Sequence, residues 1–431
     1  MINRLVPPPI HNAVSFDLTL VPSQRHKLSN GVPVIAVDAG VEEVLQIEWV
    51  FAAGNSFEQA NTIAAATNFL LKNGTSTRNA LQINEQIDFY GAFLNRHCYN
   101  ESATLTLHTL SKHLPDLLPV ITDILTDSIF AQQEIDLFVQ NSKQKLSVNL
   151  RKCDFVANRQ IDSLLFGANH PYGRYSSFEA FDAITRNQLF AFYETFYKQG
   201  ELVIFIAGKL PANWLQLLDE AFGHLPLRPL IPVKTQPQIP ALPVADNRVV
   251  RISNDAQGVQ GAIRLARPFP NRHHPDFQKV SVLNTVFGGF FGSRLMSNIR
   301  EDKGYTYGIH SFVQNNIGPC AWMVTTEAGK EVCEAAIQEV YNEMELLRNE
   351  LIDDEELLLV RNYLIGSILS SLDGPFQMIG RWKGYYLHGI DDGTGYFNRA
   401  VETIKTVSAE ELQSLAQTWL QPETFYEMVV V

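Results

Sequence analysis

The sequence predicts an α/β protein made of two tandem copies of one domain, and three observations lead to this prediction. The order of strands and helices predicted before residue 225 recurs after residue 246. A proline-rich stretch, which cannot be helical, separates the two copies. The predicted strands alternate apolar and polar side chains, which favours mostly antiparallel sheets covered on one face by helices. We therefore predict domains at 1–224 and 247–431, joined by an extended linker at 225–246.

The first copy begins with a hairpin that turns at Asn30 and Gly31, a pair suited to the positive backbone angles of a tight turn. Apolar residues at period two mark the later strands, and apolar residues at period 3.6 mark the helices. In chain order these elements are a strand at 45–55, helices at 61–71 and 79–90, two strands turning near Asn100, helices at 113–127 and 132–166, a loop at 170–184, a helix at 186–197, a strand at 201–210 and a helix at 212–222.

The second copy repeats this plan. Its strand at 261–269 matches the strand at 45–55, and its helix at 276–287 matches the helix at 61–71. Its remaining elements are strands at 305–313 and 320–329, helices at 330–347 and 353–369, and a strand at 425–431 that matches the strand at 201–210. With 431 residues, the chain is long enough to form two cores of ordinary domain size.

Composition and charge exclude several classes of partner. A net charge of -12 argues against binding to nucleic acid or to an anionic membrane, and is compatible with a basic peptide. No apolar run is long enough to cross a bilayer, and Pro7, Pro8 and Pro9 interrupt an N-terminus that lacks the apolar core of a secretory signal. The four cysteines are scattered, as expected for reduced thiols. We expect a cytoplasmic protein.

The most informative run extends from Phe287 to Val313. A helix leads into a glycine-rich turn, and a second, short helix follows before the chain becomes a strand at Tyr305. Ser293 is placed to cap the short helix, and Gly304 is placed to end it. The glycines that free the backbone in this turn are Gly288, Gly289 and Gly292.

Arg300 and Tyr307 stand on either side of the connection between the short helix and the strand. A guanidinium offers a fixed fork of donors, and a phenol can donate a hydrogen bond to an oxyanion without titrating near neutral pH. An alternative is that Arg300 pairs at the surface with Glu301 or Asp302 and that Tyr307 is a half-buried strand residue.

This run resembles the C-terminal signature of the pitrilysin and mitochondrial-processing-peptidase clan. The match consists of two glycines, a Ser-Arg-Leu triplet, an Arg-Glu pair, a glycine and a tyrosine, which are Gly288, Gly289, Ser293, Arg294, Leu295, Arg300, Glu301, Gly304 and Tyr307. The resemblance implies a metallopeptidase-clan fold along nearly the whole chain. It also implies that Arg300 and Tyr307 help to bind a peptide and to stabilise a tetrahedral intermediate at a zinc ion held elsewhere.

The zinc motif of this clan, in a run resembling G-x-A-H-x-x-E-H-x-x-x-x-G-T, is degenerate here. Counting back from Gly74 and Thr75, the two histidine positions and the glutamate position hold Ala65, Phe69 and Asn68. These side chains cannot bind zinc or act as a carboxylate base. An ungapped alignment places Lys145 at the third ligand, a glutamate in the family. We therefore expect no cofactor in this chain.

Other histidines do not rebuild a metal site in the sequence. His108 and His113 are spaced poorly for one helical face, and His97 and His108 fall on neighbouring predicted strands. His273 and His274 precede a proline in a loop, and no carboxylate stands at ligand spacing beside any of these pairs.

The resemblance leads to one functional hypothesis and two alternatives. The clan includes heterodimers in which one subunit carries zinc, so we expect a non-catalytic subunit that supplies Arg300 and Tyr307 to an H-x-x-E-H-bearing homologous partner. An extended peptide would add to the edge strand at Leu94, Asn95 and Arg96, which resembles the family's L-N-A strand. That strand is equally compatible with an ordinary exposed edge guarded by charge. The chain is alternatively a purely structural or peptide-binding protein, or, least favoured, a free-standing hydrolase with a relocated metal. A homodimer is also possible.

Overall fold

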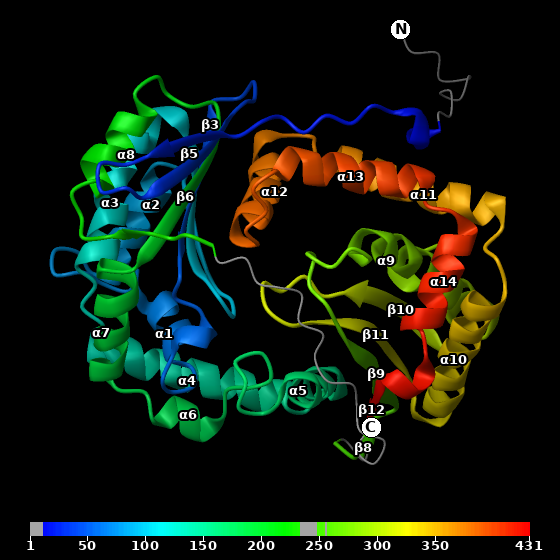
Figure 1. The fold of residues 1–431 in the computed structure, drawn as a ribbon. Helices are drawn as coiled ribbons and strands as arrows, with labels where there is room; N and C mark the ends of the chain where they lie inside the picture. Colours follow the sequence, from blue (N-terminus) through cyan, green and yellow to red (C-terminus); the bar gives the residue numbers. More distant parts are fainter. Residues whose placement is uncertain (1–11, 233–247, 255–256) are drawn as a thin grey trace, which may run out of the picture.

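The computed structural model describes residues 12–232, 248–254 and 257–431, and it confirms the predicted fold class. Two sheets lie in two halves of the molecule, each with helices packed against it (Figure 1). Residues 233–246 of the predicted linker lie outside the described residues. Within its described part, Arg228–Pro229 form a short strand, β7, beside the first sheet.

The first sheet contains seven strands. Its main order is β1-β2-β6-β3-β5-β4, in which β2 and β6 are parallel and the other neighbours are antiparallel. Its central strands are rich in Val, Ile and aromatic residues and are almost fully buried, as expected for strands covered on both faces. The strands are β1 (Gln24–Lys27), β2 (Pro33–Asp38), β3 (Val44–Phe51), β4 (Phe93–Cys98), β5 (Ala103–Leu110) and β6 (Glu201–Gly208).

The second sheet repeats the topology of the first. Its order is β10-β11-β9-β12-β8, with β8 and β12 parallel and the other neighbours antiparallel. This order matches β4-β5-β3-β6-β2, and the parallel pair stands at the same place in both, so the predicted duplication is confirmed. The strands are β8 (Val249–Ile252), β9 (Gln260–Phe269), β10 (Thr306–Val313), β11 (Cys320–Gly329) and β12 (Tyr426–Val430).

Most predicted helices are present, with a few differences. The single helix predicted at 132–166 is two helices, because the chain breaks around Leu150 and restarts at Cys153. The predicted loop at 170–184 contains a short helix, which Ser177 caps. The helices are α1 (Ile63–Leu70), α2 (Ala80–Phe89), α3 (Leu114–Thr126), α4 (Gln132–Asn149), α5 (Cys153–Phe166), α6 (Phe178–Asp182), α7 (Arg186–Tyr193), α8 (Trp214–Phe222), α9 (Phe277–Asn284), α10 (Cys333–Asn349), α11 (Asp354–Ser370), α12 (Pro375–Leu387), α13 (Gly393–Thr406) and α14 (Ala409–Trp419).

The two halves exchange one helix each across their boundary (Figure 1). Helix α5 of the first half packs on β9 and β12, where Ala157 and Ile161 are buried with Ala266 and Met428. Helix α12 of the second half packs on β2 and β6. Each sheet is therefore covered on its second face by a helix from the other half, which joins the halves into one body.

The two halves make a second contact, between the β4–β5 turn and the β10–β11 turn. The largely buried carboxyl group of Glu101 lies at this contact. Glu101, in the β4–β5 turn, faces the backbone N–H of Gly318 in the β10–β11 turn, and the Tyr172 hydroxyl accepts a hydrogen bond of 3.1 Å from the same N–H. Burial, which outweighs these backbone contacts, raises the pKa of Glu101 to about 7 from 4.5. The folded state therefore binds a proton here that the unfolded chain has already lost.

We expect this carboxyl to make stability fall as pH rises. Because the folded pKa is the higher one, the stabilising effect of the proton is present below pH 4.5 and is lost as pH rises through about 7. Glu101→Gln should therefore remove a pH-dependent loss on the order of 2 kcal/mol between about pH 5 and about pH 8, measured by denaturant unfolding. Glu85→Gln on the exposed face of α2 is the control. An unchanged pH profile in Glu101→Gln would contradict the assignment.

Candidate functional site

Helix α1 shows what occupies the degenerate zinc motif. Ala65 and Phe69 point to solvent, and the exposed fraction of Phe69 is 43%. Asn68 is buried, and its amide donates hydrogen bonds to the Thr104 carbonyl oxygen (3.3 Å) and to the Tyr197 hydroxyl (3.2 Å). The side chain at the general-base position is therefore used to fix α1 on the sheet. These residues do not fit a zinc ion.

Thr62 begins this helix in a strained conformation. It stands where the family's G-x-A-H run has glycine, and its φ is 78°, in the left-handed region. A β-branched residue pays a steric penalty there that glycine does not. Its hydroxyl is also buried without a hydrogen-bond partner among the described residues. The start of α1 keeps the backbone geometry of a glycine although the glycine is absent.

We expect Thr62→Gly to stabilise the protein by about 1 kcal/mol, because the strain at φ 78° is released. The free energy of unfolding in urea measures this effect. The control is Thr122→Gly in the regular part of α3, which should destabilise the protein by up to about 1 kcal/mol because glycine is a poor helix former. Equal losses from both substitutions would refute the strain at Thr62.

A guanidinium and two aromatic rings lie beside the position of the second family histidine. The Arg96 guanidinium stacks on the Phe69 ring at 4.7 Å and donates a hydrogen bond to the Phe69 carbonyl oxygen at the end of α1. The Phe138 ring of α4 lies 5.2 Å from the Phe69 ring. Burial lowers the pKa of Arg96 to about 10, so the group stays cationic near neutral pH. The cationic Arg96 guanidinium therefore lies against Phe69, the position at which the zinc motif of the family has its second histidine.

Lys145, at the predicted third-ligand position, and the nearby histidines do not form a metal site either. Lys145 is exposed on α4, two turns beyond Phe138 on the same helix, and carries a positive charge at the predicted third-ligand position. His97 lies opposite Thr104 in the sheet, and His108 bonds Gln46 at 3.1 Å. In the described ranges, no three His, Cys, Asp or Glu side chains are grouped as metal ligands would be.

The glycine turn packs tightly against β10. A Cβ atom on Gly288 would lie 2.7 Å from the Cβ of Ser311, so only glycine permits this approach. Gly304 has a φ of 66° and ends the short helix as predicted. Ser293, by contrast, does not cap that helix. It is 1% exposed, and its hydroxyl has no partner among the described residues.

Arg300 and Tyr307 lie on the same connection but have different surroundings. The Arg300 guanidinium stacks on the Phe291 ring at 4.6 Å and lies 3.8 Å from the Glu301 carboxylate, which is a long ion pair. Phe291 belongs to the glycine turn, and the sequence reasoning gave it no role. The two consecutive phenylalanines among the glycines were the available signal.

Tyr307 projects almost completely into solvent. Its exposed fraction is 93%, and it falls where the pairing of β10 with β11 shifts register between Thr306 and Ile309. Such bulges redirect side chains, so Tyr307 leaves the sheet instead of being half-buried. No hydrogen bond between Tyr307 and Arg300 is present in the described part of the chain.

A cleft of about 360 Å³ adjoins Tyr307 at the boundary of the two halves. Arg264 of β9 is 2% exposed there and donates hydrogen bonds to Asp154 and Asn158 of α5. Burial raises the pKa of Glu327 on the same cleft, and the Asp154 charge adds to this effect. Arg300 does not line this cleft.

Among the described strands, β4 pairs only with β5 and so forms one edge of the first sheet. Leu94 is buried, Asn95 is exposed and Arg96 is half-buried, while Phe93 is 68% exposed at the start of the strand. The edge lies beside α1 and thus next to the degenerate motif. An edge strand of this kind can accept an extended peptide through backbone hydrogen bonds.

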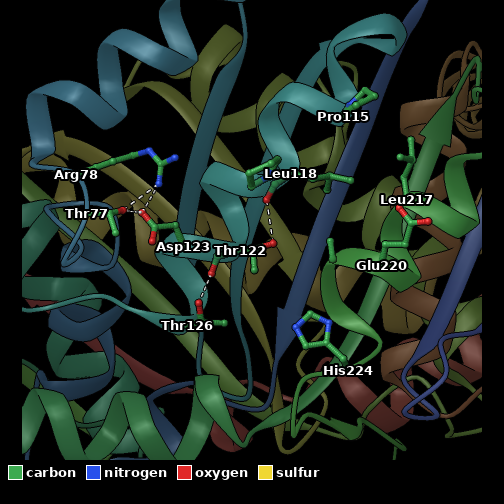
Figure 2. Close-up of a pocket in the computed structure, with 12 residues that line it drawn as sticks. Thr77, Arg78, Pro115, Leu118, Thr122, Asp123, Thr126, Leu217, Glu220 and His224 are labelled. Atoms are coloured by element: carbon green, nitrogen blue, oxygen red, sulfur yellow. Dashed lines mark hydrogen bonds and ion pairs between the residues drawn. The ribbon is translucent and has the colours of Figure 1, made fainter.

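A second cavity, of about 690 Å³, opens between α3 and α8 (Figure 2). Figure 2 shows the Arg78 guanidinium paired with the Asp123 carboxylate at 2.6 Å on one side, with Glu220 and His224 on the other. The residues predicted for the site do not line it. It is a separate feature on the helical side of the first half.

Comparisons with known proteins agree with this geometry. Residues 183–364 match the family model described as the peptidase M16 inactive domain. An uncharacterized zinc protease of Mycobacterium bovis is 27% identical over 271 residues, a stretch that covers 61% of this chain and 60% of the relative. This chain thus aligns with about three fifths of that protein. Another uncharacterized zinc protease, from Bacillus subtilis, is 20% identical over 83% of this chain and 86% of its own length.

Solved structures extend the similarity of fold to almost the whole chain. The crystal structure of a peptidase M16 inactive domain from Pseudomonas fluorescens has a TM-score of 0.84 and 23% identity, and the alignment covers 95% of this chain and 98% of that one. A protease from Helicobacter pylori has a TM-score of 0.83 at 14% identity. The structure also contains no described helix long and apolar enough to span a membrane. The resemblance found in the sequence is therefore confirmed: residues 183–364 match the peptidase M16 inactive domain, the chain is similar to proteins named uncharacterized zinc protease, and its fold is that of the M16-like solved structures.

Proposed function

We propose that this chain is the non-catalytic subunit of a heterodimeric zinc peptidase. The observation that carries the proposal is a contrast within one chain. Every ligand position on α1 is lost, whereas the connection that holds Arg300 and Tyr307 keeps its glycine geometry and presents Tyr307 at 93% exposure. A solvent-facing phenol at a bulge is a poor contribution to this chain's own stability and is well placed to reach another subunit.

Each of the two side chains would act as a hydrogen-bond donor to the peptide. The Tyr307 hydroxyl has no acceptor among the described residues. The Arg300 guanidinium stacks on the Phe291 ring, and its one ion pair among those residues is the 3.8 Å contact with Glu301. Both therefore keep donors free for the oxygen that gains negative charge during attack on a peptide carbonyl. A homologous partner with an intact H-x-x-E-H helix would supply the metal and the general base. This chain would hold no cofactor.

The peptide would lie along an edge strand in an extended conformation. In this chain that edge is β4, where Asn95 is exposed, Arg96 is half-buried and Leu94 is buried. Backbone hydrogen bonds would provide most of the affinity. We also propose a cytoplasmic location, which is supported by the four cysteines, since all of them are free thiols.

Reconstitution with a zinc-bearing homologue from the same genome tests this function. This chain alone with added zinc should not cleave a library of peptides, and the mixed pair should cleave them. Cleavage by this chain alone, abolished by a chelator, would refute the proposal and support a relocated metal site.

A second candidate function is peptide binding without proteolysis. The exposed β4 edge with Phe93 at 68% exposure favours it, because neither feature needs a catalytic partner. Retention of peptides by the chain alone, together with no cleavage by any mixed pair, would establish this alternative.

A further inference from the structure

A cavity of about 460 Å³ lies beside the loop that joins β9 to α9, and basic side chains form much of its wall. The loop contributes Arg272, His273 and His274, and α13 contributes Arg399. The residues predicted for the peptidase-like site do not line this cavity. Because the whole chain has a net charge of -12, a group of basic side chains around one cavity is unexpected. The cavity is therefore a separate candidate for a binding site.

The Arg272 guanidinium lacks an acidic partner. Its Nε–H donates a hydrogen bond of 2.8 Å to the Asn315 side-chain oxygen, while its two terminal nitrogens form no hydrogen bond or ion pair with another described residue. Burial lowers the pKa of Arg272, and the neighbours that most oppose this effect are the phenols of Tyr396 and Tyr385, not a carboxylate. A half-buried cation without a counter-ion is costly, so the free end of this guanidinium suits an anion that a ligand supplies.

The hydrogen bonds of the two histidines fix where each imidazole carries its proton. The Nδ1 atom of His274 accepts the Asp276 N–H at 3.2 Å, so in the neutral ring the proton is on Nε2. That Nε2–H has no acceptor in the described part of the chain. His273, by contrast, uses its Nε2–H to donate to the His388 carbonyl oxygen at 2.6 Å. His274 therefore retains one hydrogen-bond donor even when it is uncharged.

Hydrogen bonds hold the loop that carries these groups in place. Asn271 is 2% exposed, and its side-chain oxygen accepts the His273 N–H at 3.2 Å while its carbonyl oxygen accepts the His274 N–H at 3.0 Å. The Tyr396 hydroxyl donates to the Arg272 carbonyl oxygen at 3.3 Å. The donors are thus positioned before a ligand arrives, which reduces the cost of ordering them on binding.

The two carboxylates that line the same cavity do not neutralise Arg272. Asp392 accepts the Gly395 N–H at 2.7 Å at the start of α13, and its other oxygen lies 3.7 Å from Arg399. Asp391 is exposed, and neither carboxylate forms an ion pair with Arg272 in the described ranges. The positive charge of Arg272 therefore remains available on the inner wall.

We propose that this cavity binds the phosphate or carboxylate group of a small organic molecule, with Arg272 as its principal contact. A guanidinium fork matches two oxygens of such a group, and His274 and Arg399 supply further donors. A volume of about 460 Å³ is in the range of small-molecule pockets and exceeds what an inorganic anion fills, so the organic part has room. The site is independent of the proposed function, because it uses neither Arg300 nor Tyr307.

Calorimetric titration of the full chain with phenyl phosphate, benzoate and inorganic phosphate tests this site. Arg272→Gln should weaken binding of the organic probe by about tenfold or more, because a charged hydrogen-bond donor is lost. Arg272→Lys, which keeps the charge and removes the fork, should weaken it by about threefold or more. Arg228→Gln is the matched control, since it replaces an arginine of β7 whose side chain is 64% exposed, and it should leave binding unchanged.

The probes also distinguish the two sources of the anionic group. Tighter binding of phenyl phosphate than of benzoate would identify a phosphorylated ligand, and the reverse order would identify a carboxylate. The proposal is wrong if neither organic probe binds, or if inorganic phosphate binds as tightly as both of them. Unchanged binding in either Arg272 variant would also overturn it, and Arg272→Lys decides the matter if Arg272→Gln does not fold.

Discussion

Cleavage by the reconstituted pair should fall about a hundredfold or more when Arg300→Ala or Tyr307→Phe is introduced into this chain, because each removes a donor to the developing oxyanion. The loss should appear mainly in kcat, since the donors act in the transition state, and KM should change little. Steady-state kinetics on a fluorogenic peptide measure both constants.

Two neighbouring residues provide controls for this experiment. Lys303→Ala removes a cation three residues from Arg300, and Tyr305→Phe removes a hydroxyl two residues from Tyr307. Both should leave kcat within about twofold. Because Tyr307 is 93% exposed, Tyr307→Phe should not change the free energy of unfolding. Full activity of the pair with both Arg300 and Tyr307 replaced would exclude their catalytic role.

The second large effect concerns the helix exchange. Lys383 of α12 contacts both carboxylate oxygens of Glu48 at 2.8 Å, and the Glu48 side chain is 7% exposed in the middle of β3. Lys383→Met should lower the free energy of unfolding by about 3 kcal/mol, because it leaves a buried carboxylate without a counter-ion. Guanidinium unfolding at neutral pH measures the loss.

A double substitution and a surface pair sharpen this prediction. Glu48→Leu combined with Lys383→Met should recover most of the loss, because both charges are then removed together. Lys209→Met, which breaks the pair with Glu43 whose side chains are 50% and 67% exposed, should cost less than about 0.5 kcal/mol. If Lys383→Met costs no more than Lys209→Met, the exchanged helix does not depend on this ion pair.

The spacing of apolar residues in the sequence was enough to predict the strands and helices that are buried on one face or along their whole length. The apolar runs of β3 and β6 and the turn at Asn30 and Gly31 were predicted close to their observed bounds. The break between α4 and α5 was missed, because Leu150 to Lys152 contain neither glycine nor proline. Helix α5 then enters the other half, where Ala262 and Ala266 receive it. Local sequence cannot indicate that a helix leaves its own domain.

For the candidate site too, some features could be predicted from the sequence and others could not. The identities of Ala65, Asn68 and Phe69 excluded zinc on their chemistry alone, and the spacing of Arg300 and Tyr307 placed them on one connection. The exposure of Tyr307, the contact of Arg300 with Phe291 and the strain at Thr62 were not visible, because each depends on a backbone bulge, a ring brought from the glycine turn or a φ angle.

The sequence by itself determined the two-copy α/β plan and the loss of the metal ligands, because periodicity and side-chain chemistry are properties of the residues. Only the tertiary structure decided which helix covers which sheet and which side chains are left exposed to solvent. Those features arise from contacts between residues far apart in the chain, such as Glu48 with Lys383, and the free energy of such contacts is set by packing rather than by local pattern.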